Sequence, residues 1–415
     1  MLKQSSYDAV DMEYCNKTFS QSYTFYFDCA IMSYAVFYAI KYSQLDSYSL
    51  LRIIKQLFFI ISSCASILGI VKHFKWTLFN TVSFMCLLFI PLYLRFHINS
   101  TVLVVTLLIM CAYNVPFSHI TQKCLDALML VFIIVLFSMF IGLIEDRLYY
   151  RDKDFFENSY AHDLGFKYYG YYAYLGMGVV QCLIYRWRKH LNVAKIGFLL
   201  ILSYVFFILS STRLQMYSCI AFISCIILLP YIPKFFFNNK LMGIISILIY
   251  PSICFILYYV SKYSILSLFL DNFDELNQMM SGRLRLNEEA FLYYDANLWG
   301  NIVEFDTEEG TNTYFYIDSG YLHTLLESGI VYTGIIMLLY SILFYKVYKA
   351  KAYYLFLWLG LYSIICISNG LLTSILANPI LLLAFSNVDN ISYDYELDLK
   401  RSRVRTQSSK LVSTI

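Results

Sequence analysis

One long polar stretch, residues 259–318, interrupts an otherwise apolar sequence and carries most of the residues that could do chemistry. Arg283 and Arg285 lie near its middle, among many carboxylates. An arginine presents a planar fork of donors that matches phosphate oxygens, so this pair could hold an anionic substrate. Local ion pairing is the competing interpretation, because Glu288 and Glu289 follow Arg285 at helical i,i+3 and i,i+4 spacing.

The same polar stretch ends in Asp318, just where the next apolar run begins. His323 and Glu327 follow it at i,i+4 spacing, which places them on one face of a helix that enters the membrane. A histidine or a carboxylate at such a depth is a candidate general acid or base. The alternative is a structural role, in which Tyr321 and His323 anchor the interface and Glu327 joins a buried network.

A third cation, Arg213, separates two closely spaced apolar runs that form a predicted helical hairpin. It could contact a phosphate group of a substrate bound near Arg283. It could equally extend its charged end to the membrane interface, as long basic side chains do.

The elements that must position these residues are predicted to be membrane helices. The chain is 59% hydrophobic and 14% charged, whereas a soluble domain is typically about 25% charged. This composition indicates an all-α polytopic membrane protein, forming a single integral membrane domain over residues 1–415. It excludes a nucleic-acid-binding module, because no basic tract is present. The 11 cysteines form neither a CxxC motif nor a metal-ligand spacing with histidine, so we expect no metal.

Twelve apolar runs are long enough, or nearly so, to cross a bilayer. They are Tyr23–Ile40, Ile54–Val71, Trp76–Leu94, Thr101–Tyr113, Leu125–Ile144, Tyr168–Tyr185, Ile196–Ser211, Leu214–Pro230, Leu241–Val260, Ser319–Tyr345, Tyr353–Asn369 and Leu371–Phe385. Within the polar stretch, Ser264–Leu270 and Leu284–Tyr294 are predicted to be helices along the membrane surface.

Lysine and arginine in the short loops set the orientation. Four basic clusters fall on one side, taken as the cytoplasm: residues 186–195, 234–240, 346–351 and 400–405. Both termini and the tail 386–415 are then cytoplasmic, and the large loop 259–318, between the ninth and tenth helices, lies outside. Lys41, Arg52 and Lys55 in the first loop oppose this orientation.

Two motifs in this arrangement resemble those of the Wzy-type O-antigen and capsular polysaccharide polymerases, in the O-antigen polymerase and ligase superfamily. The first is Ser281-Gly282-Arg283 followed by the turn Leu298-Trp299-Gly300. The second is Asp318–Leu322 running into Leu325–Ile330. Ser211-Thr212-Arg213 resembles the arginine that follows an earlier span in the same superfamily. The similarity covers the chain from about Leu125 to its end.

The resemblance implies a metal-independent and cofactor-free membrane glycosyltransferase in the bacterial plasma (inner) membrane. It would join oligosaccharide repeat units carried on undecaprenyl pyrophosphate at the outer face. Arg213, Arg283 and Arg285 would bind the pyrophosphate. Asp318, His323 or Glu327 would act as the base, and Tyr321 and Trp299 would contact the sugars. The implied partners are the lipid-linked glycan, membrane lipid, a chain-length regulator and a flippase, and no nucleic acid.

Two other functions fit the same pattern. A ligase would move finished glycan to another acceptor, and the ligases of this superfamily use a histidine in a region comparable to that of His323. A flippase or other transporter for lipid-linked oligosaccharide would suit twelve spans. Transporters, however, place their sites near the midplane and often show repeats, whereas the polar residues here gather in one external loop.

Overall fold

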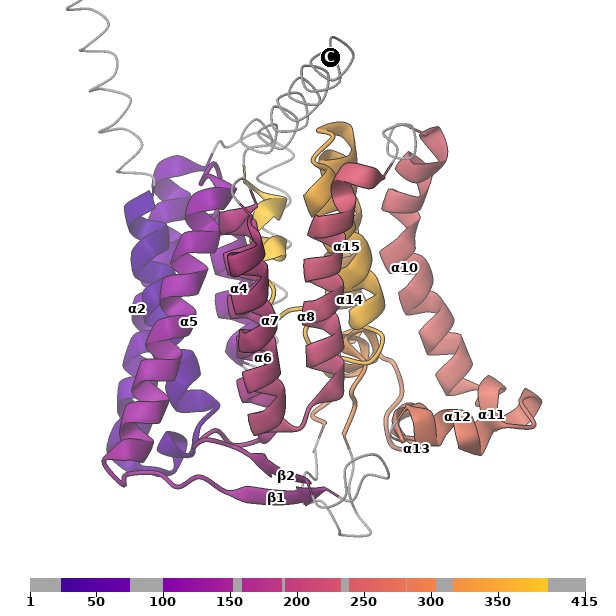
Figure 1. Cartoon of the computed structure of the whole chain (residues 1–415), viewed down its shortest axis with the longest axis horizontal. Coiled ribbons are helices and arrows are strands. Elements are labelled where there is room, and N and C mark those ends of the chain that lie inside the picture. The colour runs from indigo at the N-terminus through magenta and orange to yellow at the C-terminus, as the bar shows by residue number, and fades with distance from the viewer. Residues whose placement is uncertain are drawn as a thin grey trace, which may run out of the picture.

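The structure is a computed structural model of a bundle of helices that run side by side (Figure 1). It describes residues 24–74, 100–151, 159–188, 191–232, 239–280, 282–303 and 316–386. The predicted span Trp76–Leu94 and the tail beyond Ser386 lie outside the described residues.

The bundle is built from apolar helices. They are the helix at 24–41, α2 (Ser49–His73), α4 (Ser100–Cys111), α5 (Phe117–Phe140), α6 (Tyr169–Trp187), α7 (Val193–Ser210), α8 (Arg213–Leu228), α10 (Lys240–Lys262), α14 (Gly320–Lys349) and α15 (Tyr353–Ile365). Among the described residues, α2, α5, α7, α10 and α14 are long and apolar enough to cross a membrane. The fold is therefore consistent with a multi-pass membrane protein.

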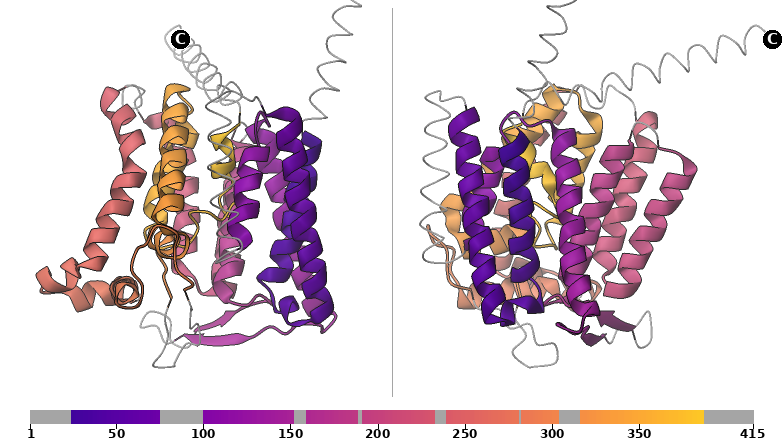
Figure 2. Two further views of the ribbon diagram at one scale, coloured as in Figure 1. Left: turned by 180° about the vertical axis from the view of Figure 1, so that it is seen from behind. Right: turned by 90° about the vertical axis from the view of Figure 1, so that its left-hand side faces the viewer.

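One end of the bundle carries the two strands and the short helices of the polar stretch (Figures 1 and 2). There β1 (Leu148–Arg151) pairs antiparallel with β2 (Ser159–His162). The short helices α11 (Ile265–Phe269), α12 (Phe273–Met279) and α13 (Arg283–Tyr293) lie at this end too. We call it the loop end. Helices α11 and α13 confirm that the two segments predicted to be helical within the polar stretch are helices, whereas the hairpin was not predicted.

Lys55, one of the first-loop basic residues that oppose the predicted orientation, lies at the loop end beside a carboxylate. The ammonium groups of Lys55 and Lys167 both pair with the carboxylate of Asp46, the latter at 2.7 Å. Burial alone would raise the pKa of Asp46, but these two hydrogen-bonded lysines outweigh it and lower that pKa.

The last predicted span, Leu371–Phe385, is wrong as a helix. Helix α15 ends at Ile365, and the chain then runs through turns into the 3₁₀ segment η3 (Pro379–Ala384). It still returns to the end opposite the loop end, where the carbonyl of Phe385 accepts a hydrogen bond from Asn114 N.

Buried tyrosines explain why this irregular segment is tolerated deep in an apolar bundle. The hydroxyl of Tyr340 donates to the Leu372 carbonyl at 2.8 Å, and that of Tyr362 donates to the Ala377 carbonyl at 3.1 Å. Non-helical backbone at membrane depth requires partners of this kind, because lipid offers none. Hydropathy alone could not reveal the segment, since its side chains are as apolar as those of a helix.

Candidate functional site

Helix α14 is broken near its start, and this break builds the site. Gly329 has φ 82° and ψ 170°, a backbone conformation that is essentially confined to glycine. The segment from Gly320 to Ser328 is therefore a short helix of its own at the loop end. The side chain of Ser319 caps it by accepting a hydrogen bond from Leu322 N.

The turn around Leu298-Trp299-Gly300 docks on that break. The carbonyls of Asn297 and Leu298 accept hydrogen bonds from Ile330 N at 2.9 Å and Val331 N at 3.3 Å. Both N–H groups belong to the first turn of the second part of α14. The helix itself offers no carbonyl to accept a hydrogen bond from N–H groups at its start. The two sequence motifs that surround these residues thus form one structural unit.

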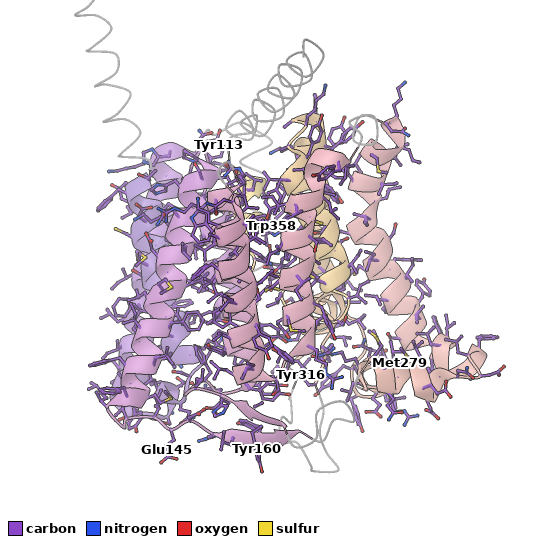
Figure 3. The ribbon with its side chains drawn as sticks, in the orientation of Figure 1. Tyr113, Glu145, Tyr160, Met279, Tyr316 and Trp358 are labelled. Carbon is purple, nitrogen blue, oxygen red and sulfur yellow. The ribbon has the colours of Figure 1, made fainter. Side chains whose placement is uncertain are left out.

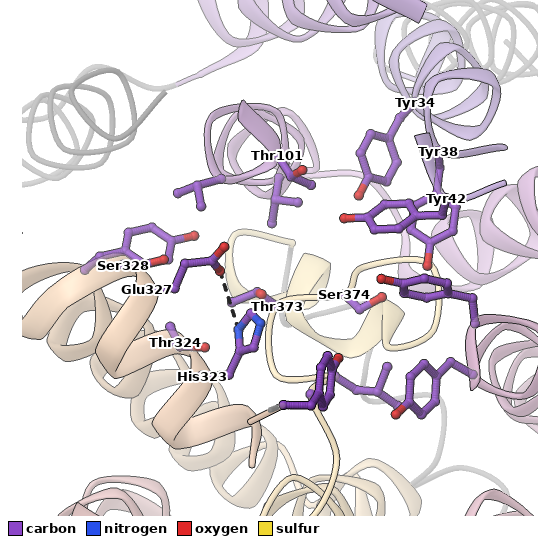
Figure 4. Close-up of a pocket in the computed structure, with 18 residues that line it drawn as sticks. Tyr34, Tyr38, Tyr42, Thr101, His323, Thr324, Glu327, Ser328, Thr373 and Ser374 are labelled. Atoms are coloured by element: carbon purple, nitrogen blue, oxygen red, sulfur yellow. Dashed lines mark ion pairs between the residues drawn. The ribbon is translucent and has the colours of Figure 1, made fainter. Parts of the chain in front are cut away.

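The short helix presents one polar face to a cavity of about 130 Å³. His323, Thr324, Glu327 and Ser328 all line it, and Figure 4 shows His323 and Glu327 directed into the same space. Nδ1 of His323 lies 3.5 Å from Oε2 of Glu327, and the two side chains are 24% and 18% exposed. The prediction that they share one helical face is confirmed. Such a pair, half-buried and open to a cavity, can exchange a proton with a bound hydroxyl.

Tyrosines form the facing wall. Tyr34 and Tyr38 come from successive turns of the helix at 24–41, and Tyr42 directly follows its end. Tyr171 and Tyr174 come from α6. Ring centroids are 4.3 Å apart for Tyr38 and Tyr42, and 4.9 Å apart for Tyr42 and Tyr171. The sequence reasoning missed this wall. The i,i+4,i+8 spacing of the first three was a visible signal, but tyrosine is too common in this chain for it to stand out.

An ion pair lies beside the cavity. Nε of Arg283 donates to Oδ2 of Asp318 at 2.8 Å, and the side chains are 25% and 17% exposed. Burial opposes the charge of the guanidinium, but the adjacent carboxylate outweighs it and raises the pKa of Arg283. Tyr174, which lines the cavity, contributes to the same shift. Asp318 also follows Tyr316, another lining residue, which lies at the loop end (Figure 3).

The other two arginines predicted to bind pyrophosphate, Arg285 and Arg213, do not line the cavity. Arg285 is exposed and pairs with Asp274 at 2.8 Å, so its local partner is neither Glu288 nor Glu289. Arg213 begins α8 and is half-buried, but it is not among the residues that line the cavity.

The two aromatic residues predicted to contact sugars also differ from each other. Tyr321 is fully buried, and its hydroxyl donates to the Ser363 carbonyl at 3.0 Å. Trp299 is exposed in the docked turn. In this conformation, therefore, Trp299 has a surface that a sugar ring could reach and Tyr321 has none.

The chain matches no protein-family model, no curated protein and no solved structure.

Proposed function

We propose that this protein is a membrane glycosyltransferase that polymerises lipid-linked oligosaccharide repeat units into a surface polysaccharide, an O-antigen or a capsule. The observation that carries the proposal is the cavity at the loop end, with His323 and Glu327 on one wall and the Arg283–Asp318 pair beside it. The resemblance of the two motifs to the Wzy-type polymerases supports the choice of substrate, an oligosaccharide on undecaprenyl pyrophosphate.

The proposed reaction is a single displacement. A hydroxyl oxygen of the acceptor glycan forms a bond to the anomeric carbon of the donor glycan. The bond from that carbon to the pyrophosphate oxygen breaks, and undecaprenyl pyrophosphate leaves with the electron pair. The proton of the acceptor hydroxyl passes to a base. Pyrophosphate is a good leaving group, so positioning matters more than strong acid catalysis.

Arg283 is the proposed contact for the pyrophosphate. Among the described residues, its hydrogen-bonding partner is Asp318, reached through Nε. The two terminal nitrogens of the same fork would then meet phosphate oxygens, and Asp318 would hold the fork in place. Stabilisation of a developing negative charge by such a fixed cation is usually the largest catalytic contribution.

Glu327 and His323 are the proposed proton acceptor and its partner. Both line the cavity, whereas Asp318 is engaged by a guanidinium and lies outside the lining. The tyrosine wall opposite supplies aromatic rings and hydroxyls for the acceptor sugar.

A ligase is the second candidate, and the place of His323 in the cavity favours keeping it. Deleting the gene in the bacterium that encodes it separates the functions. Surface glycan reduced to single repeat units supports the polymerase. Lipid-linked polymer that accumulates without surface attachment supports the ligase. Repeat units retained on the inner leaflet point to a flippase and contradict the proposal.

A further inference from the structure

A second cavity, of about 210 Å³, lies between α5 and α6 at the end of the bundle opposite the candidate site. No carboxylate is among the described residues that line it. Its polar lining consists of Ser118, Thr121, Gln122, Tyr185, Arg186 and Arg188. Two guanidinium groups beside hydroxyl and amide groups make this a cavity suited to an anion.

Arg188 is fixed in place at this cavity. Its guanidinium carbon lies 3.7 Å from the ring centroid of Tyr185, and Nη1 donates to the Tyr185 carbonyl at 2.5 Å. Tyr185 is itself buried, and it packs edge-on against Phe117 with centroids 4.9 Å apart. The cation is thus held by a rigid aromatic support. A fixed cation of this kind binds an anion with little loss of side-chain freedom.

The start of α5 adds a second positive contribution. This 24-residue helix begins at Phe117, and its cap residue Pro116 makes no side-chain hydrogen bond. Its first turn holds no acidic residue of its own, and the carboxylate that contacts this turn, Asp28, lies 2.6 Å from the His119 ring and 3.9 Å from the Lys123 ammonium group. The nearest carboxylate on the same helix, Asp126, is engaged by Gln122 at 2.8 Å and by Lys123 at 3.4 Å.

The surroundings resemble a membrane interface. Trp187 follows Arg186, and the ammonium group of Lys195 lies 5.6 Å from a Trp187 ring. Tryptophan and basic residues gather at the level of lipid headgroups. Further along α5, Ile133 and Phe137 are exposed and apolar, as expected of a surface that meets lipid tails.

We propose that this cavity binds a phosphate group, and that its source is the headgroup of an anionic phospholipid in the leaflet opposite the candidate site. Arg188 and Arg186 would hold the phosphate, and the start of α5 with Ser118 would complete the site. Basic pockets between membrane helices are suited to lipids of this class. This site is independent of the glycosyl-transfer proposal.

The test is lipid retention by the purified full-length protein in native mass spectrometry. Phosphatidylglycerol should be retained in preference to phosphatidylcholine. Arg186→Gln and Arg188→Gln should each lower that retention about fivefold, and Arg188→Lys should lower it less than Arg188→Gln. Lys240→Gln is the matched control, because Lys240 is exposed at the same end of the bundle and does not line the cavity.

Competition with inorganic phosphate shows whether the bound phosphate group belongs to a lipid headgroup or to a soluble ligand. Retained phosphatidylglycerol that millimolar phosphate does not displace supports a lipid headgroup. Displacement by phosphate, with the same dependence on both arginines, supports the phosphate site with a soluble ligand. Equal retention of the two lipids, or arginine variants that behave like Lys240→Gln, would overturn the proposal. Arg186 is exposed, so Arg186→Gln is not expected to disturb folding.

Discussion

Gly300 and Gly329 touch through their backbones, although 28 residues separate them. A Cβ added to Gly329 would come within 2.4 Å of Gly300 N, and one added to Gly300 would come within 2.1 Å of the Glu327 carbonyl oxygen. Because real Cβ atoms essentially never approach this closely, neither position can accept a side chain without moving the turn. This contact fixes the end of the short helix against the docked turn.

Gly329→Ala is therefore expected to disrupt the site. The positive φ costs about 1–3 kcal/mol for a residue with a side chain, and the backbone clash adds to that cost. Gly334→Ala on the same helix is the control, since a Cβ there would meet nothing within 4 Å. Thermal unfolding in detergent measures the difference. Equal stability of the two variants would show that the turn does not dock as described.

Arg283 and Arg285 lie two residues apart on α13 and give a matched test of the pyrophosphate role. Arg283→Ala should lower polymerisation by about 100-fold or more, the usual cost of losing one donor to a developing charge. Arg285→Ala should stay within about twofold, because an exposed ion pair contributes little. The readout is polymer chain length and transfer rate with purified lipid-linked repeat units. Similar losses in both variants would contradict the assignment.

Glu327→Gln should also lower the transfer rate by about 100-fold or more if the carboxylate accepts the proton. The change keeps the shape of the side chain and removes its charge. His323→Ala should cost less if His323 positions Glu327, and as much if it is the base. Ser328→Ala, in the same cavity lining, is the control and should retain its activity. Full activity of Glu327→Gln would remove it as the base.

Tyr340→Phe tests the support of the irregular segment. The substitution would leave the Leu372 carbonyl and the Asn378 side-chain amide without the hydroxyl that both contact at 2.8 and 2.9 Å. A loss of about 1–3 kcal/mol in stability is expected for these buried partners. Tyr345→Phe removes an exposed hydroxyl from the same helix and should be close to neutral. The measurement is the melting temperature of each variant. Equal melting temperatures would contradict the proposed support of the irregular segment by Tyr340.

Local patterns in the sequence were sufficient for the features that depend on neighbouring residues. The apolar runs predicted the long helices, and the i,i+4 spacing placed His323 and Glu327 on one face, as the structure confirms. Helical periodicity also located α11 and α13. In each case the determining interactions span only a few residues, so a single sequence contains them.

Tertiary packing decided the partner of Arg283, the wall of the cavity and the irregular segment after Ile365. Arg283 could have paired with carboxylates on its own helix, yet its partner is Asp318, 35 residues away. Tyr38 and Tyr42 face Glu327 only because the bundle places the helix at 24–41 across the cavity from α14. The segment after Ile365 is as apolar as a helix and is held irregular by distant tyrosine hydroxyls. Contacts of this kind depend on which helices become neighbours, and that choice is made by the packing of the whole bundle.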